Sequence, residues 1–358
     1  MNLYSTIRGT GSYLPEKIVR NEDLLDCEFF DPAGSRAEKS TEEIIAKFQQ
    51  ITGINERRYI DDDLVTSDMA YLAALDALGT SGVDREDLDY IIVAHNFGDV
   101  RASGGGSDFV PSLASRVKEK LRIENPRTIP YDLAFGCPGW LQGVIQANSF
   151  LKSGLAALAL IIGAEAFSRV MDPYDRDSLI YADGAGAAIL EVVESEEPLG
   201  ILSHAVQSDT LKHAYMLRMG KSYNPDHTNG DLYLKMDGHK VYQYALKAVP
   251  AVVRECLDKA GLTLADVKKV FLHQANAKMD DAILARLFRL YGEKTVPVNV
   301  MPMTISWLGN SSVATLPTLF DLVVKGRLND HGLEPGDVIV FASVGAGMNI
   351  NAVTYRMP

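Results

Sequence analysis

The sequence predicts an α/β protein with buried sheets, built from two copies of one unit. Short apolar runs rich in branched residues are typical of buried strands, and they lie at 89–96, 128–135, 158–166 and 337–345. Between such runs, segments 67–82 and 240–261 have helical patterns. This alternation of strands and helices predicts the α/β class.

The second copy is visible as three echoes in the same order. Segments that begin at Gly82 and Gly261 both read as a helix end, a polar turn with an aspartate, and an apolar strand. "DGAGAAIL" (183–190) resembles "VGAGMNIN" (344–351), and "FLKSG" (150–154) more loosely resembles "LVVKG" (322–326). Repetition in a fixed order predicts duplication. We expect an N-terminal half at 1–195 and a C-terminal half at 196–358.

Composition excludes several classes of protein. The 358 residues carry a net charge of −12, which disfavours binding to nucleic acid and to anionic membranes. Three cysteines cannot form a disulfide framework, and the N-terminus does not resemble a signal peptide. No apolar run reaches the roughly 18 residues of a membrane span. We therefore expect a reduced, cytoplasmic protein.

The sequence also lacks the motifs that predict a metal or dinucleotide cofactor. The chain has no CxxC and no HExxH, so we expect no metal site. The glycine loops at 9–14, 184–189 and 345–350 lack a third glycine followed by a helix, so they do not predict a dinucleotide site.

Cys137 lies at a predicted strand-to-helix corner, in "AFGCPGW" (134–140). Free N–H groups at a helix N-terminus lower the pKa of a thiol and can hold an oxyanion. Gly136 permits a tight corner, and Pro138 suits the first helical position. These features predict a nucleophile. A free cysteine is as often a small buried apolar residue, so the local sequence leaves both interpretations open.

The repeat places two further candidates near Cys137. Equivalent strand ends of two packed copies meet near their symmetry axis, and His273 and Asn310 lie at such ends in the second copy. An isolated histidine after a strand is usually structural, and an asparagine that opens a helix is a common N-cap. Both alternatives stay open. Gly345 lies at another strand end, where its backbone N–H could approach a ligand.

Ordered motifs run along nearly the whole chain. They are "GTGSYLPEKIVRNEDL" (9–24), "TGINERRYI" (52–60), "FVPSLASRV" (109–117), "DLAFGCPGW" (132–140), "DPYDR" (172–176), "YADGAGAAIL" (181–190), "HQANAK" (273–278), "GNSS" (309–312) and "FASVGAGMNINAV" (341–353). With them the chain resembles the condensing enzymes of the thiolase superfamily, in the ketoacyl-acyl-carrier-protein synthase III group. The resemblance implies a doubled αβαβα five-layer fold with two pseudo-symmetric halves.

The resemblance also implies a Claisen condensation. Cys137 would take an acyl group from a thioester, and the N–H groups of Cys137 and Gly345 would hold the oxyanion. His273 and Asn310 would bind the thioester carbonyl of a second substrate, typically a malonyl thioester. Loss of carbon dioxide would give an enolate that attacks the acyl-cysteine. No cofactor is implied, only acyl thioesters of coenzyme A or acyl carrier protein.

The same resemblance implies roles for residues at the entrance, on the surface and at a dimer interface. Arg176 matches an arginine at the coenzyme A or pantetheine entrance, and Lys278 matches a basic residue for carrier docking. Arg286 and Arg289 could extend a basic patch, although a solvated helix face explains these three helix cations equally well. The family is dimeric, and the loop at 103–112 would cross the interface. Asp108 lies near the place where some relatives supply a carboxylate, and Phe109 or Val110 could enter the neighbouring tunnel or form interface core.

The chain departs from the family pattern in several places. Lys47, Ile51 and Ser343 stand where the family has tryptophan, arginine and phenylalanine, and insertions occupy 27–40 and 96–108. These departures indicate a specialised relative, with long-chain donors or non-decarboxylative or cyclising chemistry, at least as well as the initiator of fatty acid synthesis. A thioester hydrolase that uses Cys137 is a further alternative. A non-catalytic partner subunit is another, but such subunits usually lack the cysteine.

Overall fold

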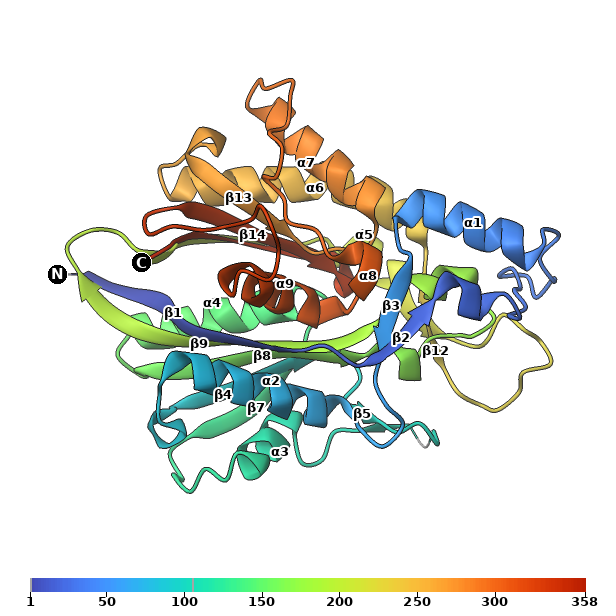
Figure 1. The fold of residues 1–358 in the computed structure, drawn as a ribbon, viewed down its shortest axis with the longest axis horizontal. Coiled ribbons are helices and arrows are strands. Elements are labelled where there is room, and N and C mark those ends of the chain that lie inside the picture. The colour runs from blue at the N-terminus through green and yellow to red at the C-terminus, as the bar shows by residue number, and fades with distance from the viewer. Residues whose placement is uncertain (1, 105) are drawn as a thin grey trace.

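The first sheet contains five strands. The computed structural model describes residues 2–104 and 106–358 (Figure 1). The strand order is β1-β9-β8-β4-β7, formed by β1 (Asn2–Tyr13), β9 (Asp183–Ser195), β8 (Leu158–Ala166), β4 (Tyr90–His95) and β7 (Ile129–Ala134). The β1–β9 and β9–β8 pairs are antiparallel, whereas β8–β4 and β4–β7 are parallel.

The second sheet repeats the first four positions of this pattern. Its order is β10-β15-β14-β13, formed by β10 (Gly200–Ser208), β15 (Asn349–Arg356), β14 (Val338–Gly345) and β13 (Val267–Leu272). The first two pairs are again antiparallel and the third is parallel. The matching order and direction confirm the doubled fold. Residue 195 ends β9, and a domain division at this point stays a prediction.

Helices cover both faces of each sheet and complete five layers (Figure 1). The outer face of the first sheet carries α2 (Thr66–Ser81) and α3 (Leu113–Lys120), and that of the second carries α6 (Gly238–Lys259) and α7 (Ala277–Leu290). Between the sheets lie α4 (Gly139–Lys152) and α9 (Thr315–Val324). Strand side chains alternate between faces, so Ile92 joins the central core while Ile91 and Val93 join the outer one.

The predicted echo around the two glycines is confirmed in the backbone. Helix α2 ends at Gly82 with φ +66°, and α6 is followed by Gly261 with φ +68°. Left-handed φ values of this kind favour glycine because it has no Cβ. Each glycine leads through a short 3₁₀ turn, η2 (Arg85–Asp87) or η6 (Leu264–Asp266), into β4 or β13.

The rest of the chain forms smaller elements outside this five-layer framework or between its parts. Helix α1 (Thr41–Thr52) begins at a capping box in which Ser40 and Glu43 exchange hydrogen bonds. The remaining elements are the pairs β2 (Lys17–Arg20) with β3 (Glu56–Tyr59), β5 (Asp99–Val100) with β6 (Ser107–Asp108) and β11 (Leu217–Gly220) with β12 (Tyr233–Met236), the helices α5 (Thr210–His213) and α8 (Ile305–Leu308), and the 3₁₀ turns η1 (Asn21–Leu24), η3 (Phe167–Arg169), η4 (Arg176–Ile180), η5 (Ala214–Met216), η7 (Ser312–Ala314) and η8 (Ala346–Met348). Within residues 2–104 and 106–358, no helix has the length and apolarity needed to cross a membrane.

Candidate active site

Cys137 lies where β7 turns into α4, as the sequence predicted. The turn depends on Gly136, whose φ is +78°. Pro138 is the N-cap of α4, because its carbonyl oxygen accepts the first helical hydrogen bond, from the Gln142 N–H at 2.9 Å. The helix therefore begins one residue later than expected. The sulfur still lies beside the helix N-terminus, where backbone N–H groups carry partial positive charge.

The thiol of Cys137 is half-buried, and its environment differs from the one expected. Burial raises the pKa of Cys137 to about 11, and a hydrogen bond from the Ser312 hydroxyl to the sulfur, at 3.5 Å, opposes this rise. The prediction of a lowered pKa is therefore wrong for the free protein. Desolvation of the sulfur thus outweighs the hydrogen bonds that it accepts.

Gly345, from the second sheet, lies directly against this corner. A Cβ built on Gly345 would be 2.7 Å from the Cys137 backbone nitrogen and 2.6 Å from Pro138 Cδ. A Cβ on Gly136 would in turn be 3.1 Å from the Ala346 nitrogen. The backbones of the two segments are thus in close contact, so only glycine fits at 345 without displacement.

His273 follows the last residue of β13, on the side of the sheet that faces the central helices. Phe271 and Phe341 lie in the central core, whereas Leu272 and Ala342 face outward, so alternation directs His273 inward. Its N–H donates to Ala342 O at 2.9 Å, three residues before Gly345. Burial lowers the pKa of His273 to about 4, which keeps the imidazole neutral near pH 7. Its Nδ1 has no hydrogen-bond partner among the described residues.

Asn310 is buried between α8 and η7. Its N–H donates to Ile180 O and its carbonyl accepts from the Ala182 N–H, both at 2.9 Å, so it bridges to Tyr181. Its side-chain oxygen accepts from the Ser312 N–H at 2.9 Å and caps that turn. The N-cap interpretation and the functional one are therefore compatible, because the amide N–H groups remain available to a ligand.

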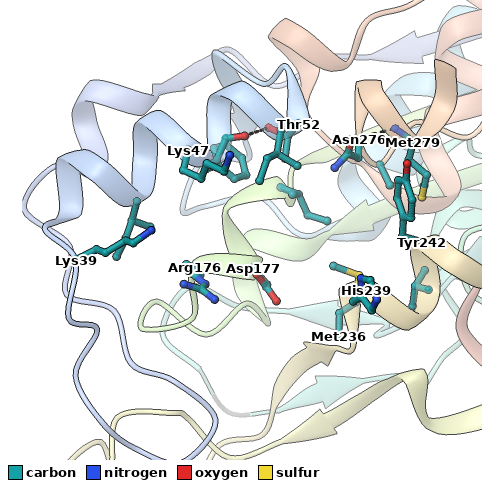
Figure 2. Close-up of a pocket in the computed structure, with 17 residues that line it drawn as sticks. Lys39, Lys47, Thr52, Arg176, Asp177, Met236, His239, Tyr242, Asn276 and Met279 are labelled. Carbon is teal, nitrogen blue, oxygen red and sulfur yellow. Dashed lines mark hydrogen bonds between the residues drawn. The ribbon is translucent and has the colours of Figure 1, made fainter. Parts of the chain in front are cut away.

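A cavity of about 490 Å³ lies near these residues, although Cys137, His273 and Asn310 do not themselves line it. Its wall includes Ala275 and Asn276, just after His273, and Ile180, which accepts from Asn310. Figure 2 shows Lys39, Lys47 and Arg176 around one part of the cavity and Met236, His239 and Tyr242 around another. Arg176 thus lines a cavity, and its role at a substrate entrance stays a prediction.

The 27–40 insertion borders a second, adjoining cavity of about 810 Å³. Lys39, Arg176 and His239 line both cavities. Lys39, Lys47 and His239 were not predicted as site residues. The insertion that carries Lys39 and the departure from the family pattern at Lys47 were the hints of their place. Their convergence depends on how α1 packs against η4 and α7.

Lys278, Arg286 and Arg289 are exposed along α7. Lys278 does not line the entrance cavity, although its neighbours Asn276 and Met279 do. Lys278 thus lies outside the cavity, beside its wall, and its role in carrier docking stays a prediction.

The loop at 103–112 lies apart from the entrance cavity in a single chain, and Gly105 lies outside the described residues. Asp108 is exposed and pairs with Arg116 at 2.8 Å, which lowers the pKa of its carboxyl. Phe109 packs near the His95 ring, with 5.8 Å between ring centres, and Val110 is 85% exposed. A role for these three residues across a dimer interface stays a prediction.

Three polar residues around the nucleophile were not predicted from the sequence; Ser312 and Glu165 are buried and Asn96 is half-buried. Ser312 touches the Cys137 sulfur, Asn96 contacts Ser312, and Glu165 contacts Asn96. Asn96 follows a strand end that is equivalent to that of His273, which was the one available indication. Within residues 2–104 and 106–358, no group of histidine, cysteine and carboxylate side chains has the geometry of a metal site.

Comparisons with known proteins agree with this geometry. Residues 131–210 match the family described as 3-oxoacyl-[acyl-carrier-protein (ACP)] synthase III, and residues 257–357 match its C-terminal part. A β-ketoacyl-[acyl-carrier-protein] synthase III of Erythrobacter litoralis is 33% identical over 354 residues, 98% of this chain and 99% of the relative.

Solved structures show the same fold. The 3-oxoacyl-(acyl carrier protein) synthase III of Pseudomonas aeruginosa PAO1 has a TM-score of 0.80 at 27% identity, covering 99% of this chain and 98% of its own. The priming β-ketosynthase of the R1128 polyketide pathway also has a TM-score of 0.80 at 27% identity, covering 99% and 96%. The chain therefore belongs to the 3-oxoacyl-[acyl-carrier-protein] synthase III family of thiolase-superfamily condensing enzymes.

Proposed function

We propose that this condensing enzyme works through Cys137, His273 and Asn310, with the backbone N–H groups of Cys137 and Gly345 as the oxyanion site. The observation that carries the proposal is the contact of Gly345 with the Cys137 backbone, which joins the two halves at the sulfur. Two N–H donors beside a nucleophile are the arrangement that acyl transfer requires.

In the first step the Cys137 thiolate attacks the carbonyl carbon of an acyl thioester. The new C–S bond forms, the tetrahedral oxyanion collapses, and the donor thiol leaves with the proton that Cys137 releases. Preorganised N–H donors contribute about 3–4 kcal/mol each to the stability of such an oxyanion.

In the second step a malonyl or β-keto thioester binds, with its thioester carbonyl held by Asn310 and neutral His273. For a malonyl thioester, C–C cleavage releases carbon dioxide and leaves an enolate whose oxygen these donors stabilise. The enolate carbon attacks the acyl-cysteine, a C–C bond forms, and the thiolate leaves. A neutral imidazole suits this step because it carries an N–H to donate.

The substrates we propose are thioesters of coenzyme A or acyl carrier protein, with no cofactor. Arg176, Lys39 and Lys47 around the entrance cavity suit a phosphate-bearing pantetheine chain, and the exposed cations of α7 suit an acidic carrier. The names of the Erythrobacter relative and of the R1128 synthase support chemistry on carrier-bound acyl groups in fatty acid or polyketide synthesis. Lys278→Glu should raise the KM for an acyl carrier substrate more than the KM for the matching coenzyme A ester.

A homodimer is the assembly we propose. Strand β7 pairs with β4 on one side, and its other edge has no strand partner among the described residues. Ile129 on this strand and Val110 in the loop before α3 are exposed apolar side chains. Unpaired edges and exposed apolar groups are commonly covered by a second copy. Light scattering of the purified protein should give twice the chain mass.

A specialised donor is favoured over acetyl-coenzyme A by Ser343. This buried serine stands where the family has phenylalanine, and its hydroxyl has no hydrogen-bond partner among the described residues. A buried hydroxyl without a partner is costly, so a substrate group that bonds to it would be selected. This supports a specialised substrate with a polar group in the same reaction.

The test is intact-mass measurement after incubation with acetyl, long-chain and β-keto thioesters. We expect one donor class to add its acyl mass to Cys137, and Cys137→Ala to abolish the adduct. His273→Ala and Asn310→Ala should still be acylated but should not form a ketone. Free acid without ketone would indicate a hydrolase, and no adduct on folded protein would indicate a non-catalytic subunit.

A further inference from the structure

A chain of hydrogen bonds leads from a buried carboxyl to the Cys137 sulfur. Glu165 Oε2, in β8, accepts from the Asn96 N–H at 3.0 Å and also from the Asn96 side-chain amide. The same amide nitrogen is 3.1 Å from Ser312 Oγ, and the Ser312 hydroxyl is 3.5 Å from the Cys137 sulfur. These residues come from four separate segments, so the chain exists only in the folded protein.

The donor and acceptor of each hydrogen bond in this chain are fixed, with Asn96 donating in both directions. A primary amide nitrogen carries two hydrogens, so Asn96 Nδ2 can donate one to Glu165 and one to Ser312. Because Ser312 Oγ accepts from Asn96, its single hydrogen is left for the sulfur. The acceptor Glu165 fixes which end of the Asn96 amide faces Ser312, since a flipped amide would place two oxygens together.

Ser312 is held for this contact by its backbone. Its φ of +55° is uncommon for serine, and its N–H donates to the Asn310 side chain. Ser312 and Glu165 are both essentially inaccessible to solvent. Water therefore does not compete for the hydroxyl, and a hydrogen bond to sulfur in such a place counts for more than one at the surface.

We propose that Asn96 and Glu165 are positioning residues that aim the Ser312 hydroxyl at Cys137, so that Ser312 stabilises the thiolate during acylation. Ser312 contacts the reacting sulfur, whereas Asn96 and Glu165 act only through it. The inference rests on the proposed role of Cys137 as the nucleophile.

Other ionisable groups also influence this region. Tyr181 lies near Cys137, and His95 and Asp183 lie near Glu165. None of them is altered in the variants below, so their effect is common to every protein compared.

The experiment measures alkylation of Cys137 by iodoacetamide against pH, with peptide mapping to separate it from Cys27 and Cys256. It needs no acyl donor, so it is independent of whether the condensation proposal holds. The variants are Asn96→Ala, Ser312→Ala and their combination. Ser311→Ala is the matched control, because Ser311 is the adjacent buried serine and its hydroxyl contacts Thr315 instead, at 3.4 Å.

We expect Asn96→Ala and Ser312→Ala each to slow alkylation at a fixed pH by roughly three- to tenfold, by moving the thiol titration upward. The double variant should be no slower than Ser312→Ala alone, because Asn96 acts through Ser312. Ser311→Ala should match the unaltered protein. If Asn96→Ala does not fold, Asn96→Thr replaces it, since one hydroxyl hydrogen cannot serve both Glu165 and Ser312.

Three results would overturn the proposal. One is an unchanged titration in the folded Asn96 variant, and another is an unchanged titration in Ser312→Ala. The third is a double variant whose loss is the product of the single losses, which would mean that Asn96 and Ser312 act independently.

Discussion

Residue 345 has no room for a side chain, because Gly345 lies against the backbone nitrogen of Cys137. A Cβ at this position would be 2.7 Å from that nitrogen and 3.0 Å from Cys137 Cβ. The contact joins the end of β14 to the start of α4, and thus one sheet to the corner of the other.

Gly345→Ala should therefore impair acylation while the two cores stay folded. The methyl group must push the corner away and misplace an oxyanion donor, and removal of one such donor costs roughly 10²- to 10³-fold in rate. Acylation of Cys137 followed by mass spectrometry measures this. Gly79→Ala in α2 is the control, because its Cβ would meet open space, and it should leave the rate unchanged. Equal rates in both variants would contradict the proposed oxyanion site.

The free thiol of Cys137 should titrate far above neutral pH. With a pKa raised by burial to about 11, the thiolate fraction rises about tenfold for each pH unit between about pH 7 and pH 10. The rate of Cys137 alkylation by iodoacetamide should follow the same slope. A plateau that begins below about pH 8 would show that the helix N-terminus and Ser312 outweigh burial.

His273 should stay neutral over the working range, since burial lowers its pKa to about 4. The condensation step should then show no acid limb from His273 above about pH 5. His273→Ala should reduce decarboxylation of a malonyl thioester by roughly 10²- to 10³-fold and leave acylation intact. Release of labelled carbon dioxide measures decarboxylation, and intact mass measures acylation. If acylation is lost to the same extent, the proposed assignment of His273 to the condensation step is wrong.

Glu165 should make the protein less stable as pH rises. Burial raises its pKa to about 7, so the folded state binds the proton more tightly than the unfolded state with its value of 4.5. The stability that protonation contributes is fully present below about pH 4.5 and is lost as pH rises through about 7, which amounts to about 3 kcal/mol.

Glu165→Gln mimics the protonated form and should remove this loss. In urea unfolding, the free energy of unfolding of the variant should rise relative to that of the unaltered protein between about pH 5 and pH 8. Glu124→Gln, at an exposed position, should show no such gain. The interpretation fails if both substitutions give the same pH dependence.

Much of this arrangement could be predicted from the sequence because it follows from periodicity. Apolar runs located the central strands, and the echoes at Gly82 and Gly261 revealed two units whose strand ends meet. That logic placed Cys137, His273 and Asn310 in one region. Gly345 followed from its position at a strand end.

The rest depends on long-range packing that no local pattern records. "AFGCPGW" indicates a helix N-terminus, but it does not show that Ser312, 175 residues away, contacts the sulfur. The link between Asn96 and Ser312 spans 216 residues, and that between Asn96 and Glu165 spans 69. The direction of the thiol pKa was therefore predicted wrongly, although the position of the thiol was predicted correctly.

The bridge between Asn310 and Tyr181 restricts how this chain can recombine. Asn310 belongs to the second half in sequence, yet its backbone is bonded to Ile180 and Ala182 of the first. A chimera could join this chain up to β9 to the second half of a distant homologue. It could retain both hydrophobic cores and still lack matching contacts between the two halves. The site around Asn310 therefore depends on the contact between the two halves as well as on each core.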